Sequence, residues 1–412
     1  MLHRRRSSES FHQGAPAYSD AAASRRVLYI QYTNPAGYPP LEHSSRILAD
    51  HGWQVTFLGT GAQGAQALRF PPHPRIEVRL MPFQAPGWRQ KLHYLQFCAL
   101  VLLWSIRWRP TLLYVSDALA CPAGLLLSYL PGLRVIYHEH DSPEPESREG
   151  LAGRPSGFMR GIYWARRRLA RRAWRVVLPG AGRVEHFLAD TGADPCRACS
   201  VWNCPACEEI GPARAEPVGS PLRLLYHGSV VPARLPFAVI EAMAVLHGRV
   251  SLTVVGYETI GHWGYLRELA ELAERLGIGG QIELVGAVPT REQLYAHCRA
   301  ADVGIALMPT RTWNINEQTM LTGPSNKIFD YLACGLAALV PDQPGPQALY
   351  VAPGYARACN PANPASIADA LRWYLEHPAE LRAMGERGRQ RVLSEWNYEQ
   401  QFAPVLAQLS EA

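Results

Sequence analysis

Lysine is nearly absent from this chain of 412 residues. Lys and Arg together number 41, yet only Lys91 and Lys327 are lysines. Where arginine is otherwise the rule, a lysine at the start of a helix indicates a need for a compact point charge, because arginine offers a planar fork instead. The scarcity of lysine therefore directs attention to Lys327 and the stretch around it.

Other absences narrow the class of protein. The loop after the first expected strand, residues 33–40, does not read G-x-G-x-x-G, and we expect neither a dinucleotide nor any other cofactor. Residues 1–25 contain no apolar signal-peptide core, which predicts a cytoplasmic protein whose 9 cysteines stay reduced. The most apolar run, residues 92–108, contains His93, Gln96 and Ser105, so we expect a buried or interfacial helix there instead of a membrane span.

Length and charge bound the organisation of the chain. With 412 residues and 48% hydrophobic content, the chain can build two cores, which predicts two domains. The net charge of +6 is concentrated in residues 4–6 and 160–175, so the remainder is near neutral and we expect no nucleic-acid partner. Residues 1–25, rich in Ser, Ala and Arg, are expected to form a disordered basic tail.

The stretch around Lys327, residues 322–340, reads as loop, helix and strand. Ser325 or Asn326 can cap a short helix that ends at Gly335, and an apolar strand follows. Such a helix start presents free backbone N–H groups, the positive end of the helix dipole and the Lys327 ammonium in one place, which predicts a phosphate site. Asp330 follows on a neighbouring part of the same face, where its carboxylate can accept hydrogen bonds from ribose hydroxyls. An ordinary amphipathic helix between two strands is the alternative.

A strand, helix, strand pattern opens the first half of the chain. The strand at 27–30, the helix at 41–51 and the strand at 54–58 predict a parallel sheet with its ligand crevice at the carboxyl ends of the strands. The loop with Gly37 falls at that edge. Further strands are expected at 77–81, 112–115, 134–137 and 176–179, with helices ending near 109, spanning 161–174 and beginning at 183.

The strand at 134–137 runs directly into His138-Glu139-His140-Asp141. Side chains alternate along an extended segment, so every second one of these can face a cleft at the carboxyl end of the strand. His138 and His140 could also bind a metal, but Glu139 points the opposite way and no third ligand is near in the sequence. A purely structural pair of loop histidines is a third interpretation.

The helix at 161–174 combines apolar and aromatic side chains with arginines at 166–168, 171 and 172. This composition predicts peripheral association of residues 160–175 with an anionic membrane surface, at the inner face of the membrane for a cytoplasmic protein. A solvated helical face is the alternative.

Four cysteines form a C-x2-C-x4-C-x2-C pattern: Cys196, Cys199, Cys204 and Cys207. Zinc ribbons separate their two cysteine pairs by a dozen or more residues. The short gap here contains residues 201–203, which we expect to be a strand whose alternate side chains point apart. We therefore expect structural or redox-labile cysteines and no metal site.

The strand and helix pattern restarts after a turn-rich linker at 211–221. A strand at 222–226 ends in His227-Gly228-Ser229, and Arg234 lies in the next loop, before a helix at 237–246. Like Lys327, Arg234 therefore places a positive charge close to the start of a helix. Strands at 251–255, 281–285 and 303–307, separated by helices at 265–276 and 292–300, predict a second doubly wound parallel domain.

Residues 325–335 resemble the N-K-x-F-E-Y-x-A-x-G-x-P-V signature of the retaining GT-B glycosyltransferases of family four, the glycosyl transferases group 1. Tyr226-His227-Gly228 with Arg234 is similar to the start of their donor domain. Residues 137–141 resemble their Y-D-V-H-E with His140 as the family histidine, and residues 202–205 resemble their interdomain N-x-P strand. The resemblance covers the chain from Val27 to its end.

This resemblance implies two Rossmann-like, doubly wound parallel-sheet domains of the α/β class that face a cleft. Residues 26–215 are expected to bind the acceptor, residues 216–395 the nucleotide sugar, and residues 396–412 to form a helix that returns to the N-terminal domain. The implied reaction is metal-independent transfer of a sugar, with retention, from a UDP-sugar, or as second choice a GDP-sugar, to a hydroxyl acceptor. That acceptor is a glycan, a lipid-linked molecule or a small molecule.

The family also implies roles for particular residues. Arg234 and Lys327 are expected to stabilise the charge of the departing diphosphate, and His140 to hydrogen-bond the donor sugar or the acceptor hydroxyl. Asp330 is assigned to the ribose. The remaining donor contacts are expected from Gly37, Gly228, Ser229, Val288, Pro289, Ser325 and Asn326, with Val288 and Pro289 against the base.

The sequence departs from this family at two glutamate positions, and two alternative functions stay open. The upstream glutamate of the family is Thr322 here, and Asp330 replaces the second glutamate, so the donor sugar is not specified. One alternative is an inverting GT-B glycosyltransferase of the natural-product type with His43 as the base. The other is a catalytically silent GT-B subunit that activates a partner, which Thr322 supports. The residues do not specify an oligomeric state.

Overall fold

Two parallel sheets organise the chain. The computed structural model describes residues 25–62, 67–143, 156–214, 216–259, 261–309 and 325–411. One sheet has the strand order β3-β2-β1-β4-β5-β6-β7 and the other β10-β9-β8-β11-β12-β13, and all their pairings are parallel. The strand order reverses between β1 and β4 and between β8 and β11, where ligands bind in open α/β sheets. The predicted α/β class with two doubly wound parallel sheets is confirmed.

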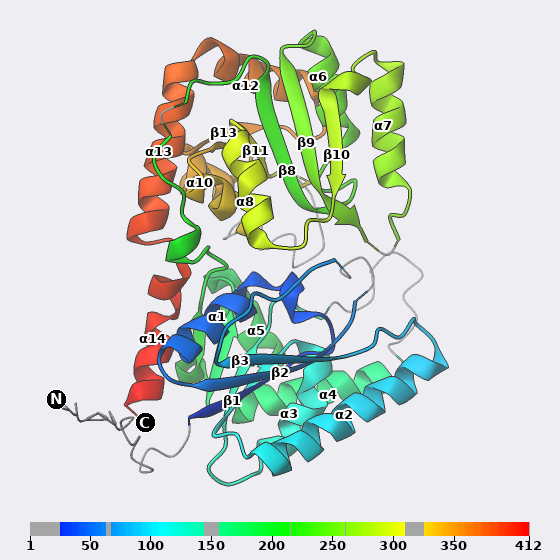
Figure 1. Ribbon diagram of the computed structural model, residues 1–412, viewed down its shortest axis with the longest axis vertical. Coiled ribbons are helices and arrows are strands. Elements are labelled where there is room, and N and C mark those ends of the chain that lie inside the picture. Colours follow the sequence, from blue (N-terminus) through cyan, green and yellow to red (C-terminus); the bar gives the residue numbers. More distant parts are fainter. Residues whose placement is uncertain are drawn as a thin grey trace, which may run out of the picture.

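The N-terminal sheet lies in the lower half of Figure 1. Its strands have apolar, buried centres because helices cover both of its faces. Helices α2 to α5 share one core with the sheet, whereas α1 packs on the opposite face. The elements are β1 Arg26–Ile30, α1 Pro39–Asp50, β2 Gln54–Thr60, β3 Ile76–Met81, α2 Trp88–Trp108, β4 Leu112–Ser116, α3 Cys121–Leu127, β5 Arg134–His138, α4 Gly157–Arg172, β6 Arg175–Leu178, α5 Ala181–Thr191 and β7 Ala198–Ser200.

The C-terminal sheet lies in the upper half of Figure 1 and is also covered on both faces. Helices α6, α7 and α12 share one core with it, and α8 and α10 share the other. The elements are β8 Leu222–Val230, α6 Phe237–Val245, β9 Val250–Glu258, α7 Tyr265–Arg275, β10 Ile282–Gly286, α8 Arg291–Ala300, β11 Val303–Ile305, α10 Asn326–Ala333, β12 Ala337–Pro341, α11 Pro344–Pro346, β13 Ala356–Cys359, α12 Pro364–Glu376, α13 Pro378–Ser394 and α14 Tyr398–Ser410.

The predicted strand at 201–203 is wrong. The strand there is β7, which pairs with β6 from Ala198 to Ser200, and the chain has left the sheet by Trp202. The sequence pattern also missed α3, β13, α12 and α13. Helix α3 was hidden by its composition, because Gly124 weakens the helical signal. A Cβ at Gly124 would lie 2.7 Å from Cγ2 of Val115, so close packing of α3 on β4 requires that glycine.

The last two helices belong to different halves of the molecule, as Figure 1 shows. Helix α13 contacts β12 and α10 of the C-terminal sheet, whereas α14 contacts α1. Tyr398, Phe402, Val405 and Leu409 of α14 join the core that contains Tyr29 and Phe57 of the N-terminal sheet. The backbone N–H of Tyr398 donates to the carbonyl of Pro205 at 2.8 Å. The end of the chain thereby ties the two sheets together.

We predict that Phe402→Ala destabilises the whole protein, because Phe402 is fully buried against the N-terminal sheet. The free energy of unfolding should fall by about 3–5 kcal/mol, the usual cost of removing a buried phenyl ring. Urea denaturation measures this. The exposed Ala403→Ser on the same helix is the control and should change it by less than about 0.5 kcal/mol. Equal effects of the two substitutions would contradict the packing of α14.

Candidate active site

A cleft of about 680 Å³ lies between the carboxyl ends of the two sheets. Every residue that the sequence analysis placed in the site lines this one cleft. They are Gly37 and His140 from the N-terminal half, and Gly228, Ser229, Arg234, Val288, Pro289, Ser325, Asn326, Lys327 and Asp330 from the C-terminal half. The fold thus brings together side chains that are up to 293 positions apart, from Gly37 to Asp330. Residues 322–324 of the key stretch, Thr322 among them, lie outside the described residues.

Lys327 sits in the first turn of α10, at the wall of this cleft. That first turn carries no acidic residue, and the Ser325 side chain makes no capping bond, so the helix dipole there is not neutralised within α10. Burial, reinforced by the nearby charge of Arg234, lowers the pKa of Lys327 to about 7, while Asp330 acts in the opposite direction. An anion entering the cleft would supply the missing negative charge.

Gly228 makes room for Lys327. Its φ of 104° is in the left-handed region, and a Cβ there would lie 3.0 Å from Nζ of Lys327. Gly228 pairs with Gly256 on β9, where a Cβ would lie 1.9 Å from the carbonyl oxygen of Gly228. Two paired glycines therefore let β8 and β9 carry the backbone close to the ammonium. Gly256 lines the cleft and was missed by the sequence analysis, although it follows a predicted strand.

Arg234 approaches the same place from the loop between β8 and α6. Its Nη1 donates to the hydroxyl oxygen of Ser229 at 2.8 Å, which fixes the guanidinium at the cleft. Its charge helps to lower the pKa of Lys327, so the two cations are electrostatic neighbours. The structure therefore places two cations beside the start of α10, an arrangement that is suited to an anionic ligand.

His140 lines the cleft from the opposite side, at the end of β5. Burial, with a smaller contribution from Arg183, lowers its pKa to about 3, so its ring is neutral near pH 7. Its Nε2 has no hydrogen-bond partner among the described residues. His138 lies behind it in the sheet, with its ring centroid 3.9 Å away and its Nδ1 2.7 Å from the hydroxyl of Tyr114. Only His140 of the two lines the cleft, and Glu139 is buried against Arg166.

Asp117 holds the segment that carries His140, and the sequence analysis missed it. Its Oδ1 accepts from the backbone N–H of His140 at 2.8 Å and its Oδ2 from Nε2 of Gln31 at 3.3 Å. Its φ of 62° is unusual for a residue other than glycine. Burial, with repulsion from Asp141 as a smaller cause, raises its pKa to about 8. Its position just after the strand at 112–115 was the available signal.

Asp330, which the sequence analysis assigned to the ribose, lines the cleft, but its carboxylate is engaged by neighbouring side chains. Its side chain is 3% exposed, and its Oδ1 accepts from the hydroxyl of Tyr295 at 2.7 Å and from Nη2 of Arg291 at 3.0 Å. Its Oδ2 lies 3.4 Å from Nε2 of His227. Burial raises the pKa of Asp330, and Arg291 counteracts it. The carboxylate is therefore part of a buried polar network beneath Lys327.

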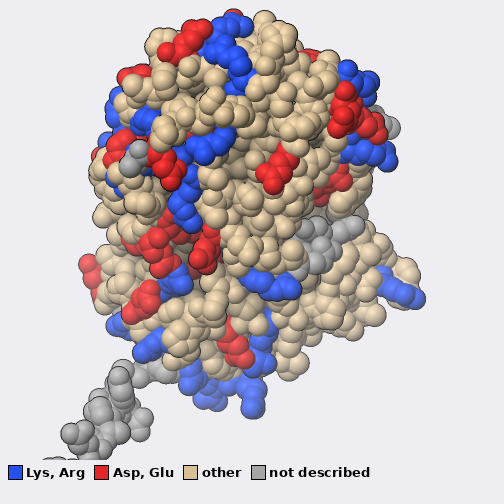
Figure 2. All heavy atoms as spheres, turned by 45° about the horizontal axis from the view of Figure 1, so that its top comes forward, with Lys and Arg blue, Asp and Glu red and all other residues tan. Residues whose placement is uncertain are grey.

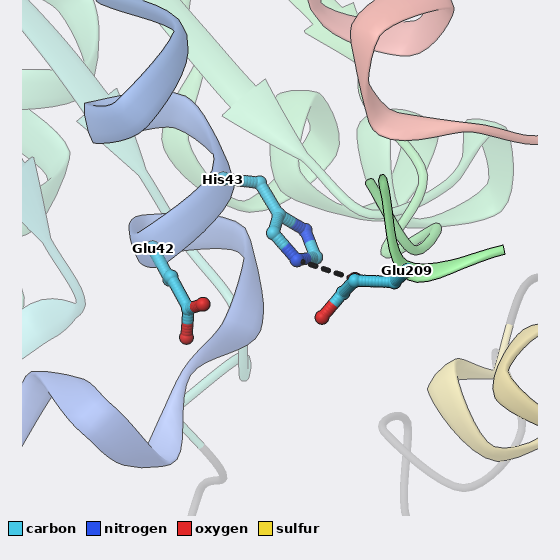
Figure 3. Close-up of side chains that lie close together, drawn as sticks. All are labelled: Glu42, His43 and Glu209. Atoms are coloured by element: carbon cyan, nitrogen blue, oxygen red, sulfur yellow. Dashed lines mark ion pairs between the residues drawn. The ribbon is translucent and has the colours of Figure 1, made fainter. Parts of the chain in front are cut away.

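This network continues across the boundary between the two halves of the chain. Arg291 at the start of α8 also pairs with Glu209, whose Oε2 lies 2.9 Å from Nε2 of His43 on α1. Figure 3 shows the His43 ring directed at Glu209. Burial alone would raise the pKa of Glu209, but the charges of Arg291 and His43 outweigh it and lower that pKa. The start of α1 is thereby connected through Glu209 to the helix that carries Lys327.

Among the described residues, one group could offer three ligand atoms to a metal ion: Glu42, His43 and Glu209. Arg291 already neutralises Glu209, so a cation there would compete with a guanidinium. The four cysteines of the C-x2-C-x4-C-x2-C pattern do not enter such a group, and all are free thiols. Cys196 and Cys207 are exposed and Cys204 is buried.

Two further observations concern the edges of the cleft. The backbone N–H of Arg69 donates to the carbonyl of Pro289 at 2.9 Å, so the loop expected to face the base also contacts the N-terminal half. A G-x-G-x-x-G spacing does occur at residues 59–64, at the end of β2, where its last two residues lie outside the described part. A dinucleotide fingerprint requires a helix directly after the glycines. The described residues between β2 and β3 form no helix.

Comparison with known proteins identifies the same two halves. The Glycosyl transferase 4-like domain matches residues 41–204, and the family described as Glycosyl transferase-like matches residues 238–407. No curated protein sequence matches the chain.

Similar solved structures cover almost the whole chain. Sucrose-phosphate synthase from Thermosynechococcus elongatus is 18% identical, with 94% of this chain and 98% of that chain covered and a TM-score of 0.68. HepE from Anabaena, in complex with UDP and glucose, is 15% identical, with 94% and 100% covered and a TM-score of 0.67. WaaG, a glycosyltransferase involved in lipopolysaccharide biosynthesis, is 16% identical, with 92% and 98% covered and a TM-score of 0.63. At these identities the likeness shows the fold alone.

We predict that Arg291→Met lowers the free energy of unfolding by about 3–5 kcal/mol, because it leaves the buried Asp330 and the half-buried Glu209 without their shared cation. Denaturation by urea near pH 7 measures this. Arg275→Met, at an exposed position on α7, is the control and should have little effect. Adding Glu209→Gln to Arg291→Met should recover part of the loss, since it removes one orphaned charge. A loss no larger than that of the control would contradict the network.

Proposed function

Because the chain belongs to the group 1 glycosyltransferases of GT-B fold, we propose that it transfers a sugar from a nucleoside-diphosphate sugar to a hydroxyl acceptor with retention of anomeric configuration. The observation that carries the proposal is the pair of cations, Arg234 and Lys327, at the uncapped start of α10 in the shared cleft. The complexes of HepE with UDP and with UDP-glucose make UDP the first donor nucleotide to test, with GDP second.

The difficult step in such a transfer is departure of the nucleoside diphosphate. As the bond to the sugar breaks, negative charge grows on the diphosphate oxygen that leaves. Lys327, Arg234 and the first backbone N–H groups of α10 are fixed before the reaction and stabilise this charge more than that of the intact donor. In this proposal they perform what a metal ion does in other phosphate-binding sites, so the reaction needs none.

The other site residues position the reactants. His140, neutral near pH 7, offers a hydrogen bond to the donor sugar or to the acceptor hydroxyl from the N-terminal side of the cleft. Gly228 and Ser229 let the diphosphate approach β8, and Val288 and Pro289 face the base. We assign Asp330 to the support of α10 through Tyr295 and Arg291, in place of the expected ribose contact.

The geometry does not favour the inverting alternative. His43, its candidate base, is 3% exposed and pairs with Glu209. The catalytically silent alternative depends on Thr322, which lies outside the described residues. Slow hydrolysis of the donor by the purified chain alone would argue against a catalytically silent subunit. The anomeric configuration of the released sugar would distinguish retention from inversion.

We predict that Lys327→Ala and Arg234→Ala each weaken UDP binding by about 10- to 100-fold, the effect of losing one hydrogen bond to a charged group. Hydrolysis of a UDP-sugar should fall further, by on the order of 100- to 1000-fold, because the charge grows in the transition state. Calorimetry and release of UDP measure the two effects.

The control for both variants is Arg267→Ala, at a side chain that is 77% exposed on α7. It should leave binding and hydrolysis unchanged, and thermal unfolding should show all three variants folded. If both cleft variants bind UDP and hydrolyse the donor like the wild type, the assignment of the diphosphate site is wrong.

We also predict that UDP binding weakens as the pH rises. The pKa of Lys327 in the free protein is about 7, and the diphosphate raises it, so binding takes up a proton above that pH. Between pH 7 and 8.5 the affinity should fall on the order of tenfold more in the wild type than in Lys327→Met. Lys327→Met is the reference, because its pH profile contains the titration of UDP but not that of the lysine. Identical pH profiles would show that Lys327 does not meet the diphosphate.

A further inference from the structure

The outer surface of the N-terminal half carries an apolar stripe that no other described element covers. It runs along α2, whose side chains Leu92, Leu95, Leu103 and Ile106 are 51%, 61%, 67% and 67% exposed. Their successive spacings of three, eight and three positions place them on one side of the helix, opposite the buried Phe97 and Val101. Monomeric soluble proteins rarely expose large side chains in such a row without a use for them.

Neighbouring helices extend this apolar surface. Helices α3 and α4 pack beside α2 against the same face of the N-terminal sheet. After α3, Tyr129 and Leu130 are 62% and 44% exposed, and Leu126 within it is 59% exposed. Trp164 of α4 is 59% exposed. We call the exposed side of these three helices the α2–α4 face.

The charges of the α2–α4 face all have one sign. No Asp or Glu occurs in α2, α3 or α4, whereas the basic residues are Arg89, Lys91, Arg107, Arg160, Arg166, Arg167, Arg168, Arg171 and Arg172. Arg166 and Arg167 are engaged by acidic partners, but Arg107, Arg160 and Arg168 make no ion pair with any residue in the described ranges. In Figure 2, basic residues gather at the lowest edge of the molecule, while both signs mix over the upper part.

Arginine and aromatic rings meet repeatedly on this face. The guanidinium carbon of Arg172 lies 3.8 Å from the ring centroid of Tyr129, and that of Arg168 lies 5.6 Å from Trp164. At the start of α2 the guanidinium carbon of Arg89 lies 5.5 Å from the ring centroid of Trp88, which is 72% exposed. Exposed tryptophan and tyrosine beside arginine are typical of the boundary between lipid headgroups and acyl chains.

We propose that the α2–α4 face docks on an anionic lipid bilayer, with the stripe of α2 at the level of the upper acyl chains and the arginines against lipid phosphates. An acidic protein or a nucleic acid would match the charge but leaves the exposed leucines and isoleucine without partners. A bilayer satisfies both, because it offers negative headgroups above an apolar layer. No described helix is both long and apolar enough to cross a bilayer.

The docking surface is separate from the cleft, and the proposal does not depend on the proposed transfer reaction. None of the stripe residues of α2 lines the cleft. The proposal extends the expectation that residues 160–175 associate with a membrane. The basic helix α4 supplies charge, and α2 supplies an apolar surface that the sequence alone could not place beside α4.

Sedimentation with lipid vesicles tests the proposal with the full chain. We expect the wild type to bind vesicles of phosphatidylcholine containing phosphatidylglycerol at least tenfold more tightly than vesicles of phosphatidylcholine alone, and added salt to weaken that binding. The triple substitution Leu95→Gln, Leu103→Gln, Ile106→Gln should abolish it. The triple substitution Arg107→Gln, Arg160→Gln, Arg168→Gln should weaken it on the order of 100-fold, at about 1 kcal/mol for each charge.

Control variants change exposed aliphatic and basic residues on the other half of the molecule. Val245→Gln with Leu276→Gln and Leu393→Gln removes side chains that are 52%, 40% and 40% exposed, and Arg267→Gln with Arg275→Gln removes exposed charges. These variants should bind vesicles like the wild type, and circular dichroism should show every variant folded.

Three results would overturn the proposal. The first is equal or absent binding to the two kinds of vesicle. The second is a dimer in solution that the α2 substitutions dissociate, which would assign the face to a second copy of the chain. The third is release of the protein from vesicles by RNA, at a concentration at which an acidic control polymer does not release it. That result would assign the face to nucleic acid.

Discussion

The site depends on keeping a lysine ammonium partly desolvated beside another cation. Burial and the charge of Arg234 lower the pKa of Lys327 to about 7, and the fold tolerates this because Asp330 lies beneath it and acts in the opposite direction. Asp330 is in turn held by Tyr295 and Arg291. The cation pair is thus arranged before any ligand arrives, which is what stabilisation of a departing anion requires.

The same network connects the cleft to the organisation of the two halves. Arg291 reaches Glu209 between the sheets, and Glu209 reaches His43 on α1. Helix α14 adds a second connection, because it leaves the C-terminal half and packs in the core of the N-terminal sheet. These contacts hold the two halves of the chain together around the cleft that both His140 and Lys327 line.

The sequence predicted the parts of the site that are local. Ser325 to Gly335 reads as a helix start with a lone lysine, and Gly335 does adopt a left-handed φ of 69°. The partners of Asp330 could not be predicted, since Tyr295 and Arg291 come from another helix and only the fold brings them together. Asp117 and Gly256 were missed although each lies just after a predicted strand, because their partners His140 and Gly228 come from other parts of the sheets. The stretch at 201–203 was assigned to a strand because its residue types suit one, whereas strand β7 ends at Ser200.

The central claim is that Lys327 meets the diphosphate of a nucleotide. Because the chain has only Lys91 and Lys327, NMR of the protein labelled with 13C at lysine Cε resolves this group directly. The account predicts that one lysine titrates with a pKa of about 7 in the free protein, that saturating UDP raises this pKa and shifts its signal, and that Lys91 is unaffected. A Lys327 signal that does not change with saturating UDP would contradict it.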